Sequence, residues 1–207
     1  MLFRSGIDLG GRQHAVDQAD FERRHPGRLT LITQNVDTLH DQAGSQDVIE
    51  LHGSLHRVLC LDCHRHSPRD VIQRQMEVDN PHMAQVHAVQ APDGDTLLDP
   101  AFEQRFQVPH CPHCNGERLK PDVVFFGETV PRERVQTCMA AVARADAVLI
   151  AGSSLMVYSG YRFALAAHEQ GKSVVAINQG VTRADALLDF KLEADVGQVL
   201  MGLVEAS

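Results

Sequence analysis

The stretch LTLITQNVDTLHDQAGSQDVIELHGS, residues 29–54, decides the fold of this chain. It opens with a short apolar run, LTLIT (29–33), and then changes at once to the polar residues Gln34, Asn35 and Asp37. A second apolar run, VIEL (48–51), is followed by a lone histidine, His52. Short apolar runs that stop at polar turns are typical of buried strands. We therefore expect two strands here, with amides, a carboxylate and an imidazole just beyond their ends.

The same pattern returns in the second half of the chain. The runs DVVFF (122–126), AVLIAG (147–152) and SVVAIN (173–178) predict three more strands of a buried parallel sheet. Amphipathic stretches at 131–145 and 161–171 predict helices between them, and Gly171 supplies a left-handed stop for the second. Alternating strands and helices predict an α/β fold, a Rossmann-like doubly wound parallel sheet. A further short helix is expected at 15–24.

Residues 57–119 interrupt this alternation of predicted strands and helices. They hold two Cys-x-x-Cys pairs and the turn-forming PDGD, and their one good helical stretch is RDVIQRQMEV (69–78). We interpret this segment as a small zinc-binding insertion. The remaining segments, 1–56 and 120–207, then form the Rossmann-like domain.

The paired cysteines predict a structural metal site. CLDC supplies Cys60 and Cys63, and CPHC supplies Cys111 and Cys114. Four thiolates from two such turns close a tetrahedral shell around Zn²⁺, and a shell without an open position is structural, not catalytic. A redox Cys-x-x-Cys pair is the alternative, and the neighbouring residues His64, His66, His110 and His113 could replace one thiolate. Soft thiolates on matched turns should nevertheless bind the metal.

Charge and composition narrow the classes of partner and the compartment. The net charge of −8 argues against a nucleic-acid backbone or an anionic membrane as the main partner, because both attract an excess of Lys and Arg. The sequence has no apolar stretch of the length that a membrane helix needs, and it does not open with a secretion signal. Cysteines in metal-binding pairs suit a reducing compartment, so we expect a cytoplasmic protein.

Polar residues and glycines follow three of the predicted strands. Gln34, Asn35 and Asp37 follow the first strand; Gly152, Ser153 and Ser154 follow another; and Asn178, Gln179 and Gly180 follow the last. Ligands of open α/β sheets bind beyond the carboxyl ends of the strands. Hydroxyls and backbone N–H groups suit a phosphate, and amides suit a ribose or a carboxamide. The alternative is that each segment is an ordinary polar turn.

Taken in order, these motifs resemble those of the sirtuins, the NAD-dependent protein-lysine deacylases. The matching segments are TQNVDTLHDQAGS, ELHGS, the two Cys-x-x-Cys pairs, LKPDVVFFGE (119–128), AGSSLMVYS (151–159) and INQG (177–180). The resemblance is greatest to the class II branch, which includes mitochondrial sirtuin four. It implies NAD as a consumed co-substrate, one structural Zn²⁺ per chain, and an acylated-lysine protein or peptide as substrate.

The resemblance also implies roles for individual residues. His52 is implied as the general base, and an imidazole pKa near 6.5 suits that role; a hydrogen-bonded core histidine is the alternative. Gln34 would lie on the ribose, with Asn35 and Asp37 near the carboxamide. The implied NAD-binding set is Gln34, Asn35, Val36, Asp37, Gly152, Ser153, Ser154, Asn178, Gln179, Gly180 and Val196. The implied substrate-binding set is Val124, Phe125, Phe126, Gly127 and Glu128.

The implied reaction transfers the acyl group from lysine to ADP-ribose and releases nicotinamide. Two alternatives remain open: transfer of ADP-ribose to a protein side chain, and a zinc-stabilised remnant that only binds. Acetyl, longer acyl and lipoyl-type groups are not distinguished by the sequence.

The start of the chain departs from the family pattern. The family begins with a glycine-rich strand–turn–helix that cradles the pyrophosphate. In this chain GIDLGGR (6–12) has the glycines, but no apolar strand is recognisable before it. We therefore expect the glycine-rich unit, and with it a central strand of the sheet, to be missing.

Overall fold

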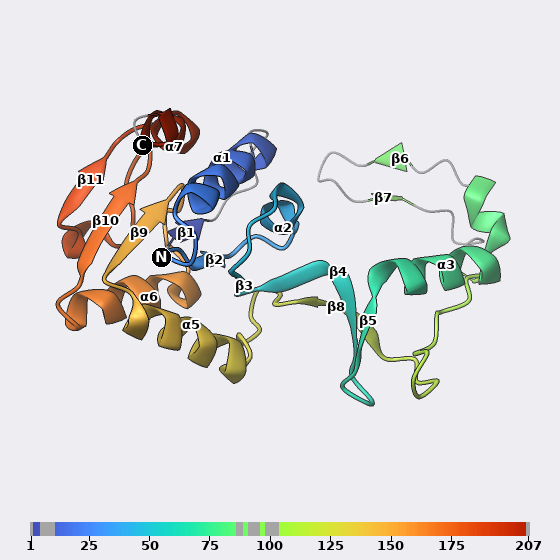
Figure 1. Ribbon diagram of the computed structural model, residues 1–207. Coiled ribbons are helices and arrows are strands. Elements are labelled where there is room, and N and C mark those ends of the chain that lie inside the picture. The colour runs from blue at the N-terminus through green and yellow to red at the C-terminus, as the bar shows by residue number, and fades with distance from the viewer. Residues whose placement is uncertain (1, 5–10, 86–88, 91–95, 98–103, 206–207) are drawn as a thin grey trace. The chain divides into compact units, whose positions relative to one another are not determined.

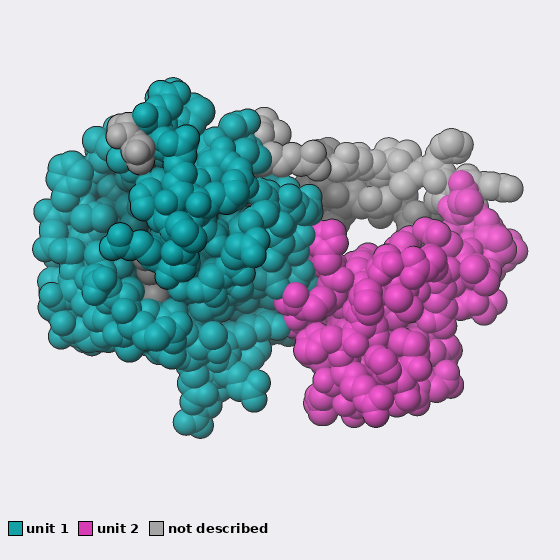
Figure 2. All heavy atoms as spheres, viewed as in Figure 1, with its two compact units in different colours: residues 1–54, 123–207 teal, residues 55–122 magenta. Residues whose placement is uncertain are grey.

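The computed structural model describes residues 2–4, 11–85, 89–90, 96–97 and 104–205. Contacts divide the chain into two compact units, which Figure 2 shows in different colours. Unit 1 comprises Met1–Ser54 and Val123–Ser207, and unit 2 comprises Leu55–Asp122.

Unit 1 is built on a six-stranded sheet whose described strands all pair in parallel (Figure 1). Its strand order is β11-β10-β9-β1-β2-β3. Taken from the β3 edge, the strands follow the 3-2-1-4-5-6 order of a doubly wound nucleotide-binding fold. The predicted α/β fold class is therefore confirmed. The strands are β1 (Leu2–Arg4), β2 (Leu31–Thr33), β3 (Val48–Glu50), β9 (Ala147–Ala151), β10 (Ser173–Ile177) and β11 (Phe190–Leu192).

The expectation that a central strand would be missing was wrong. β1 lies between β2 and β9 and pairs with both: Leu2 aligns with Leu31 and with Leu149. Its three residues, LFR, are too few to give a recognisable alternating or apolar pattern. The segment after β1, residues 5–10, lies outside the described residues.

Helices cover both faces of this sheet (Figure 1). α1 (Gly11–Arg24) packs with α7 (Val196–Glu205), and α5 (Arg132–Arg144) packs with α6 (Tyr158–Glu169). A short helix, α2 (Leu39–Ala43), follows β2 and contacts α1, and η2 (Asp185–Leu187) precedes β11. The predicted helices at 131–145 and 161–171 correspond to α5 and α6.

Two apolar clusters reflect the alternation of side chains along the buried strands. Ile32 and Ile150 belong to the larger cluster, which includes Phe163 of α6. Their neighbours Leu31 and Ala151 belong to the second cluster, beside α7. Since successive residues of a strand point to opposite faces, each strand supplies both clusters. A fully buried side chain of this size stabilises the fold by about 1.5–3 kcal/mol.

Unit 2 contains a three-stranded sheet of order β5-β4-β8 and a two-stranded hairpin. Asn80, just past the end of α3, joins that helix to the later part of the unit. Its side chain donates to Met76 O (2.9 Å) and Gln107 O (3.0 Å) and accepts from Gln107 N (2.6 Å). The elements are β4 (Gly53–Cys60), β5 (His66–Pro68), α3 (Arg69–Asp79), η1 (Pro81–Gln85), β6 (Val89–Gln90), β7 (Thr96–Leu97) and β8 (Leu119–Val123).

The prediction that residues 122–126 form a strand of the parallel sheet was also wrong. The strand is β8, it begins at Leu119, and it belongs to the smaller sheet. Pro121 lies within it, and proline is tolerated where a strand has a free edge, as β8 has in that order. Phe125 and Phe126 follow the strand and are exposed.

Candidate nucleotide, catalytic and metal sites

Polar residues follow three parallel strands at their carboxyl ends. Gln34 comes directly after β2, Gly152 after β9 and Asn178 after β10. The backbone links two of these ends, because Gly152 N donates to Ile177 O (2.9 Å). Parallel strands end at one edge of a sheet, so these residues share the edge where Rossmann-like folds bind ligands.

Gln34 and Ser153 form one packed unit at that edge. Both are buried, and the Gln34 amide donates to Ser153 Oγ (3.2 Å). Ser153 Oγ also accepts from Leu155 N (3.2 Å), which fixes the loop after β9. Gly160 packs against the same amide: a Cβ at that position would lie 2.8 Å from Gln34 Oε1. The glycine in the first turn of α6 therefore makes room for Gln34.

The segment after Gln34 forms a tight turn. Asn35 N donates to Thr33 Oγ1 (3.1 Å), and Leu39 N donates to the Asp37 carboxylate (3.1 Å). The Asp37 carboxylate therefore supports the start of α2. Asn35, Val36 and Asp37 are all half-buried, so parts of these residues reach the surface.

The third strand end is held by its own asparagine. The Asn178 amide donates to Gln179 O (2.9 Å) and Gly180 O (3.3 Å), and Gly180 has a φ of 77°. Asn178 thus shapes the turn, while Gln179 is exposed. The side chain of Val196 lies in the core cluster with Leu31. Only the backbone of Val196, at the start of α7, is left for a ligand.

His52 lies between β3 and β4, and both of its ring nitrogens have partners. Nδ1 is 3.1 Å from Gln34 O, and Nε2 is 2.9 Å from Ser159 Oγ. Burial and the positive charge of Arg134 lower the pKa of His52, while the Gln34 carbonyl opposes the shift. A half-buried imidazole with a lowered pKa is neutral at pH 7 and can accept a proton.

The segment implied for substrate binding begins beside His52. Val124 N donates to His52 O (2.9 Å). Beyond it, Glu128 closes a turn: its carboxylate accepts from Phe125 N (3.0 Å), and its own N–H donates to Phe125 O (3.0 Å). Gly127 has a φ of 88° in that turn, and Phe126 is 102% exposed. An aromatic side chain is thus presented to solvent.

The four cysteines of the paired motifs come together in unit 2. Their Sγ atoms all lie within 4.8 Å of one another, with Cys60 and Cys114 at 3.7 Å and Cys63 and Cys111 at 3.7 Å. A regular tetrahedron with Zn–S bonds of about 2.3 Å has an edge of about 3.8 Å. The two separations of 3.7 Å match that edge, and the compact group of four thiolates fits Zn²⁺.

The two cysteine turns have the same backbone geometry. His64 N donates to Cys60 O (2.9 Å), and Asn115 N donates to Cys111 O (2.8 Å). His64 and Asn115 both have a left-handed φ, 58° and 60°. Each Cys-x-x-Cys pair is thereby folded into a loop that points two sulfurs to one centre.

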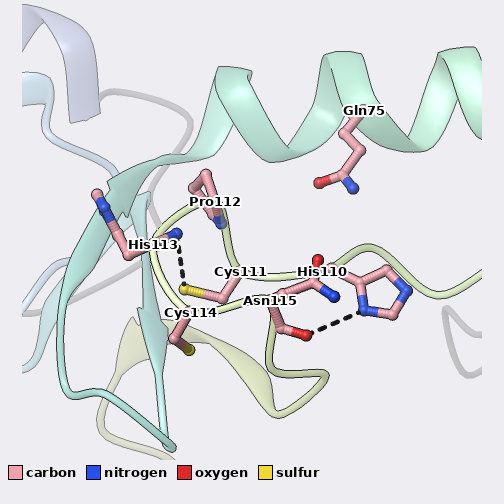
Figure 3. Close-up of a pocket in the computed structure, with 7 residues that line it drawn as sticks. All are labelled: Gln75, His110, Cys111, Pro112, His113, Cys114 and Asn115. Atoms are coloured by element: carbon pink, nitrogen blue, oxygen red, sulfur yellow. Dashed lines mark hydrogen bonds between the residues drawn. The ribbon is translucent and has the colours of Figure 1, made fainter.

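Figure 3 shows the second cysteine turn, where a hollow is lined by Gln75 of α3 and by His110, Cys111, Pro112, His113, Cys114 and Asn115. His113 N donates to Cys111 Sγ (3.4 Å). Burial of Cys111 opposes ionisation, but N–H donors from His113 and Cys114 prevail and lower its pKa to about 6. Among the described residues, the metal-competent group contains the four cysteines and none of the neighbouring histidines.

Sequence reasoning missed Ser159, which contacts His52, Gly160, which packs against Gln34, and Arg134, whose charge acts on His52. Gly160 left a weak signal, because a glycine near the start of an otherwise regular helix costs about 1 kcal/mol relative to alanine. Ser159 and Arg134 left none, since each is an ordinary polar residue within a helix.

The sheet order and the four-thiolate cluster define a Rossmann-like α/β protein with a metal-competent insertion. The sequence model described as the Sir2 family matches residues 16–159. The chain belongs to the Sir2 family, the sirtuins.

Curated relatives agree with this membership. The chain is 62% identical over 175 residues to NAD-dependent protein deacetylase 3 of Pseudomonas syringae pv. tomato, covering 84% of this chain and 62% of the relative. It is 52% identical over 171 residues to the NAD-dependent protein lipoamidase sirtuin-4, mitochondrial, of Bos taurus, covering 82% of this chain and 54% of the relative. The chain thus spans about three fifths of the length of the curated relatives that it matches.

Solved sirtuin structures share the fold. A structure described as Sir2–p53 peptide–NAD⁺ has a TM-score of 0.70 at 28% identity, covering 94% of this chain and 69% of that one. Another, described as Sir2 bound to acetylated peptide, has a TM-score of 0.71 at 27% identity, with the same coverage.

Proposed function

We propose that this protein is an NAD-dependent protein-lysine deacylase. The observation that carries the proposal is the junction of Gln34 and His52: a buried amide and a neutral imidazole meet at the carboxyl edge of a Rossmann-like sheet. Relatives named NAD-dependent protein deacetylase, and sirtuin structures described with NAD⁺ and an acetylated peptide, support the choice of reaction.

We propose that the three strand ends bind NAD. Gln34, buried against Ser153, presents a rigid amide for a ribose hydroxyl. Asn35 and Asp37 are the candidates for the carboxamide, because both are half-buried beside Gln34. The glycine–serine turn after β9 offers backbone N–H groups and the exposed hydroxyl of Ser154 for phosphate. The turn held by Asn178 and the start of α7 at Val196 would complete the site. NAD, when bound, supplies the ADP-ribose that accepts the acyl group and the nicotinamide that leaves.

We propose His52 as the general base. Its Nδ1 donates to the Gln34 carbonyl, so Nε2 carries the ring's lone pair and is the nitrogen that can take a proton. The lowered pKa keeps this nitrogen unprotonated at neutral pH. Nε2 would take the proton of a ribose hydroxyl of bound NAD, and the oxygen would keep the electron pair with which to attack the acyl carbon.

The acylated peptide is proposed to lie along residues 124–128. An extended peptide can pair with exposed backbone by strand addition, and the exposed side chain of Phe126 can contact its apolar groups. The chemistry of the acyl group is an outcome of the experiment below. Acetyl and lipoyl chains are both candidates, because the relatives include a deacetylase and a lipoamidase.

We also propose that residues 57–119 act as an inserted domain held by one structural Zn²⁺ on Cys60, Cys63, Cys111 and Cys114. The cysteines are not paired in disulfides, and this supports the proposal of a cytoplasmic location, where thiols stay reduced. In the described part of the chain, no helix is long and apolar enough to span a bilayer.

The experiment is mass spectrometry of the purified chain after incubation with NAD and acetyl-, long-acyl- and lipoyl-lysine peptides. Nicotinamide and O-acyl-ADP-ribose should form with the parent chain and not with His52→Ala, whose folding is checked by circular dichroism. An ADP-ribosylated protein without O-acyl-ADP-ribose would favour ADP-ribosyl transfer. If the folded, zinc-loaded chain forms neither product, the proposal is overturned in favour of a binding protein.

A further inference from the structure

The imidazole of His52 is held at both ring nitrogens by groups from two different elements. Nδ1 is 3.1 Å from Gln34 O, at the end of β2, and Nε2 is 2.9 Å from Ser159 Oγ, in α6. A carbonyl oxygen can only accept, so Nδ1 carries the hydrogen. In the neutral ring Nε2 is then an acceptor, and the Ser159 hydroxyl donates to it.

The position of Ser159 is fixed by its surroundings. It lies in the first turn of α6 and is only 9% exposed. The next residue, Gly160, packs against the side chain of Gln34, whose backbone carbonyl holds the other side of the ring. The turn that carries Ser159 and the strand end that carries Gln34 therefore form one rigid frame around His52.

We propose that Ser159 is a positioning residue for His52. This inference rests on the proposed function, in which Nε2 of His52 takes a proton from a ribose hydroxyl. Ser159 fixes the rotation of the ring about its side-chain bond, so that Nε2 keeps one direction before the substrate arrives. A ring held only at Nδ1 can swing away from that direction.

The hydroxyl of Ser159 can serve both protonation states of the ring. Nε2 has one lone pair, so the Ser159 hydroxyl, which rotates freely, turns its hydrogen away when the substrate hydroxyl donates there. When the O–H bond of the substrate hydroxyl breaks, its electron pair stays on oxygen and its proton forms an N–H bond at Nε2. Ser159 Oγ, 2.9 Å from Nε2, can then accept from the new N–H. Hydrogen bonds to charged groups are stronger than those to neutral groups. Ser159 thus stabilises the imidazolium more than the neutral ring, and its removal should lower the pKa of His52.

The test compares Ser159→Ala, Ser159→Thr and the control Ser173→Ala, which removes an exposed hydroxyl at the start of β10. Imidazole signals are titrated by NMR in the absence of NAD, with His52 assigned from the signal missing in His52→Ala. Ser159→Ala should lower the pKa of His52 and reduce kcat about tenfold, the effect of one lost hydrogen bond. KM for NAD should change less than twofold. Ser159→Thr keeps the hydroxyl and should restore both values, while Ser173→Ala should match the parent chain.

An unchanged titration and an unchanged kcat in folded Ser159→Ala would overturn the inference. A loss confined to KM would also overturn it, because that result means substrate binding, not positioning of the base. The NMR titration needs no activity, so it decides the contact even in a chain that fails to turn over NAD. In that case the proposed function fails separately, and the titration alone supports or overturns the hydrogen bond between Ser159 and His52.

Discussion

Single side chains set the geometry of the candidate site. Gln34 has two roles that depend on different atoms: its backbone carbonyl holds His52 Nδ1, and its side-chain amide reaches Ser153 Oγ. Both roles require that Gln34 stay in one conformation. Gly160 enforces it, because the amide fills the space in which a Cβ would lie.

The substitution Gly160→Ala should therefore distort the site. The added Cβ would lie 2.8–2.9 Å from the Oε1, Cδ and Nε2 atoms of the buried Gln34 amide. Overpacking of this kind costs about 1–3 kcal/mol, and the better helix propensity of alanine returns up to about 1 kcal/mol. We expect a net loss of about 1 kcal/mol in the free energy of unfolding and weaker NAD binding, measured by urea denaturation and calorimetry.

The matched control for that substitution is Gly202→Ala in α7. A Cβ there would have nothing within 4 Å, so alanine should stabilise the chain by about 0.5–1 kcal/mol. Equal effects of the two substitutions would mean that helix propensity alone acts at Gly160.

The lowered pKa of His52 predicts the acid limb of the activity profile. Burial, aided by Arg134, keeps the folded-state pKa below the ordinary 6.5. The base is active when neutral, so kcat/KM should stay level as pH falls to 6.5 and decline only at lower pH, through the folded pKa. Between these two pKa values the unfolded chain binds more protons, so stability should also fall as pH falls.

His52→Gln should remove that part of the pH dependence of stability. The measurements are kcat/KM and urea denaturation of the parent chain between pH 5 and 8, with the variant as the control for stability. An acid limb centred above 6.5 would contradict the burial argument.

At the scale of elements, a lysine caps the C-terminus of α5. Lys172 Nζ donates to Val142 O (2.8 Å), Ala143 O (2.7 Å) and Ala145 O (2.6 Å). The last carbonyls of a helix lack intrahelical partners. A positive charge there also interacts favourably with the negative end of the helix dipole. Lys172 thereby ties the start of β10 to the end of α5.

Lys172→Met keeps most of the length of the side chain but loses its charge and its three hydrogen bonds. We expect the free energy of unfolding to fall by about 1–2 kcal/mol. Arg132→Met, at the other end of α5, removes a cation where the dipole disfavours one and should be neutral or slightly stabilising. Thermal denaturation of both variants checks this, and equal loss in both would refute the capping role.

The elements also show how far the sequence predicts the fold. Strands β2, β9 and β10 and helices α5 and α6 were predictable, because each lies in an apolar run or an amphipathic stretch of five or more residues. β1 was missed because LFR does not lie in such a run, and its place is fixed by pairing with β2 and β9. β8 was assigned to the wrong sheet, because an apolar run does not say which strand it will pair with.

The candidate site shows the same limit. The cysteine cluster could be predicted, since two turns of fixed spacing determine which four sulfurs meet. The contacts of His52 with Gln34 and Ser159 could not, because they join residues 18 and 107 positions apart. Such contacts depend on the sheet order and on the register of α6, which no local pattern specifies.

At the scale of the whole molecule, unit 2 interrupts the sequence of unit 1: the chain leaves unit 1 within β4 and returns to it at the end of β8. Its described core is small; the buried apolar side chains of residues 55–122 are Val58, Cys60, Ile72 and Cys111. A unit of this size rarely stays folded on its apolar core alone and needs a further cross-link. A metal bound by the four cysteines supplies that cross-link, so zinc binding and the folding of unit 2 should be coupled.

Cys114→Ala should therefore lose zinc and unfold unit 2, because an incomplete thiolate shell does not retain a structural metal. His110→Ala is the matched control: it removes a neighbouring imidazole and leaves all four thiolates in place. We expect one zinc per chain by metal analysis in the parent and in His110→Ala, and protected amides in 55–122 by hydrogen exchange. Cys114→Ala, or the parent treated with a chelator, should lose both, while the sheet of unit 1 keeps its protection. Zinc retained in Cys114→Ala but lost in His110→Ala would mean that the imidazole, not that thiolate, completes the shell.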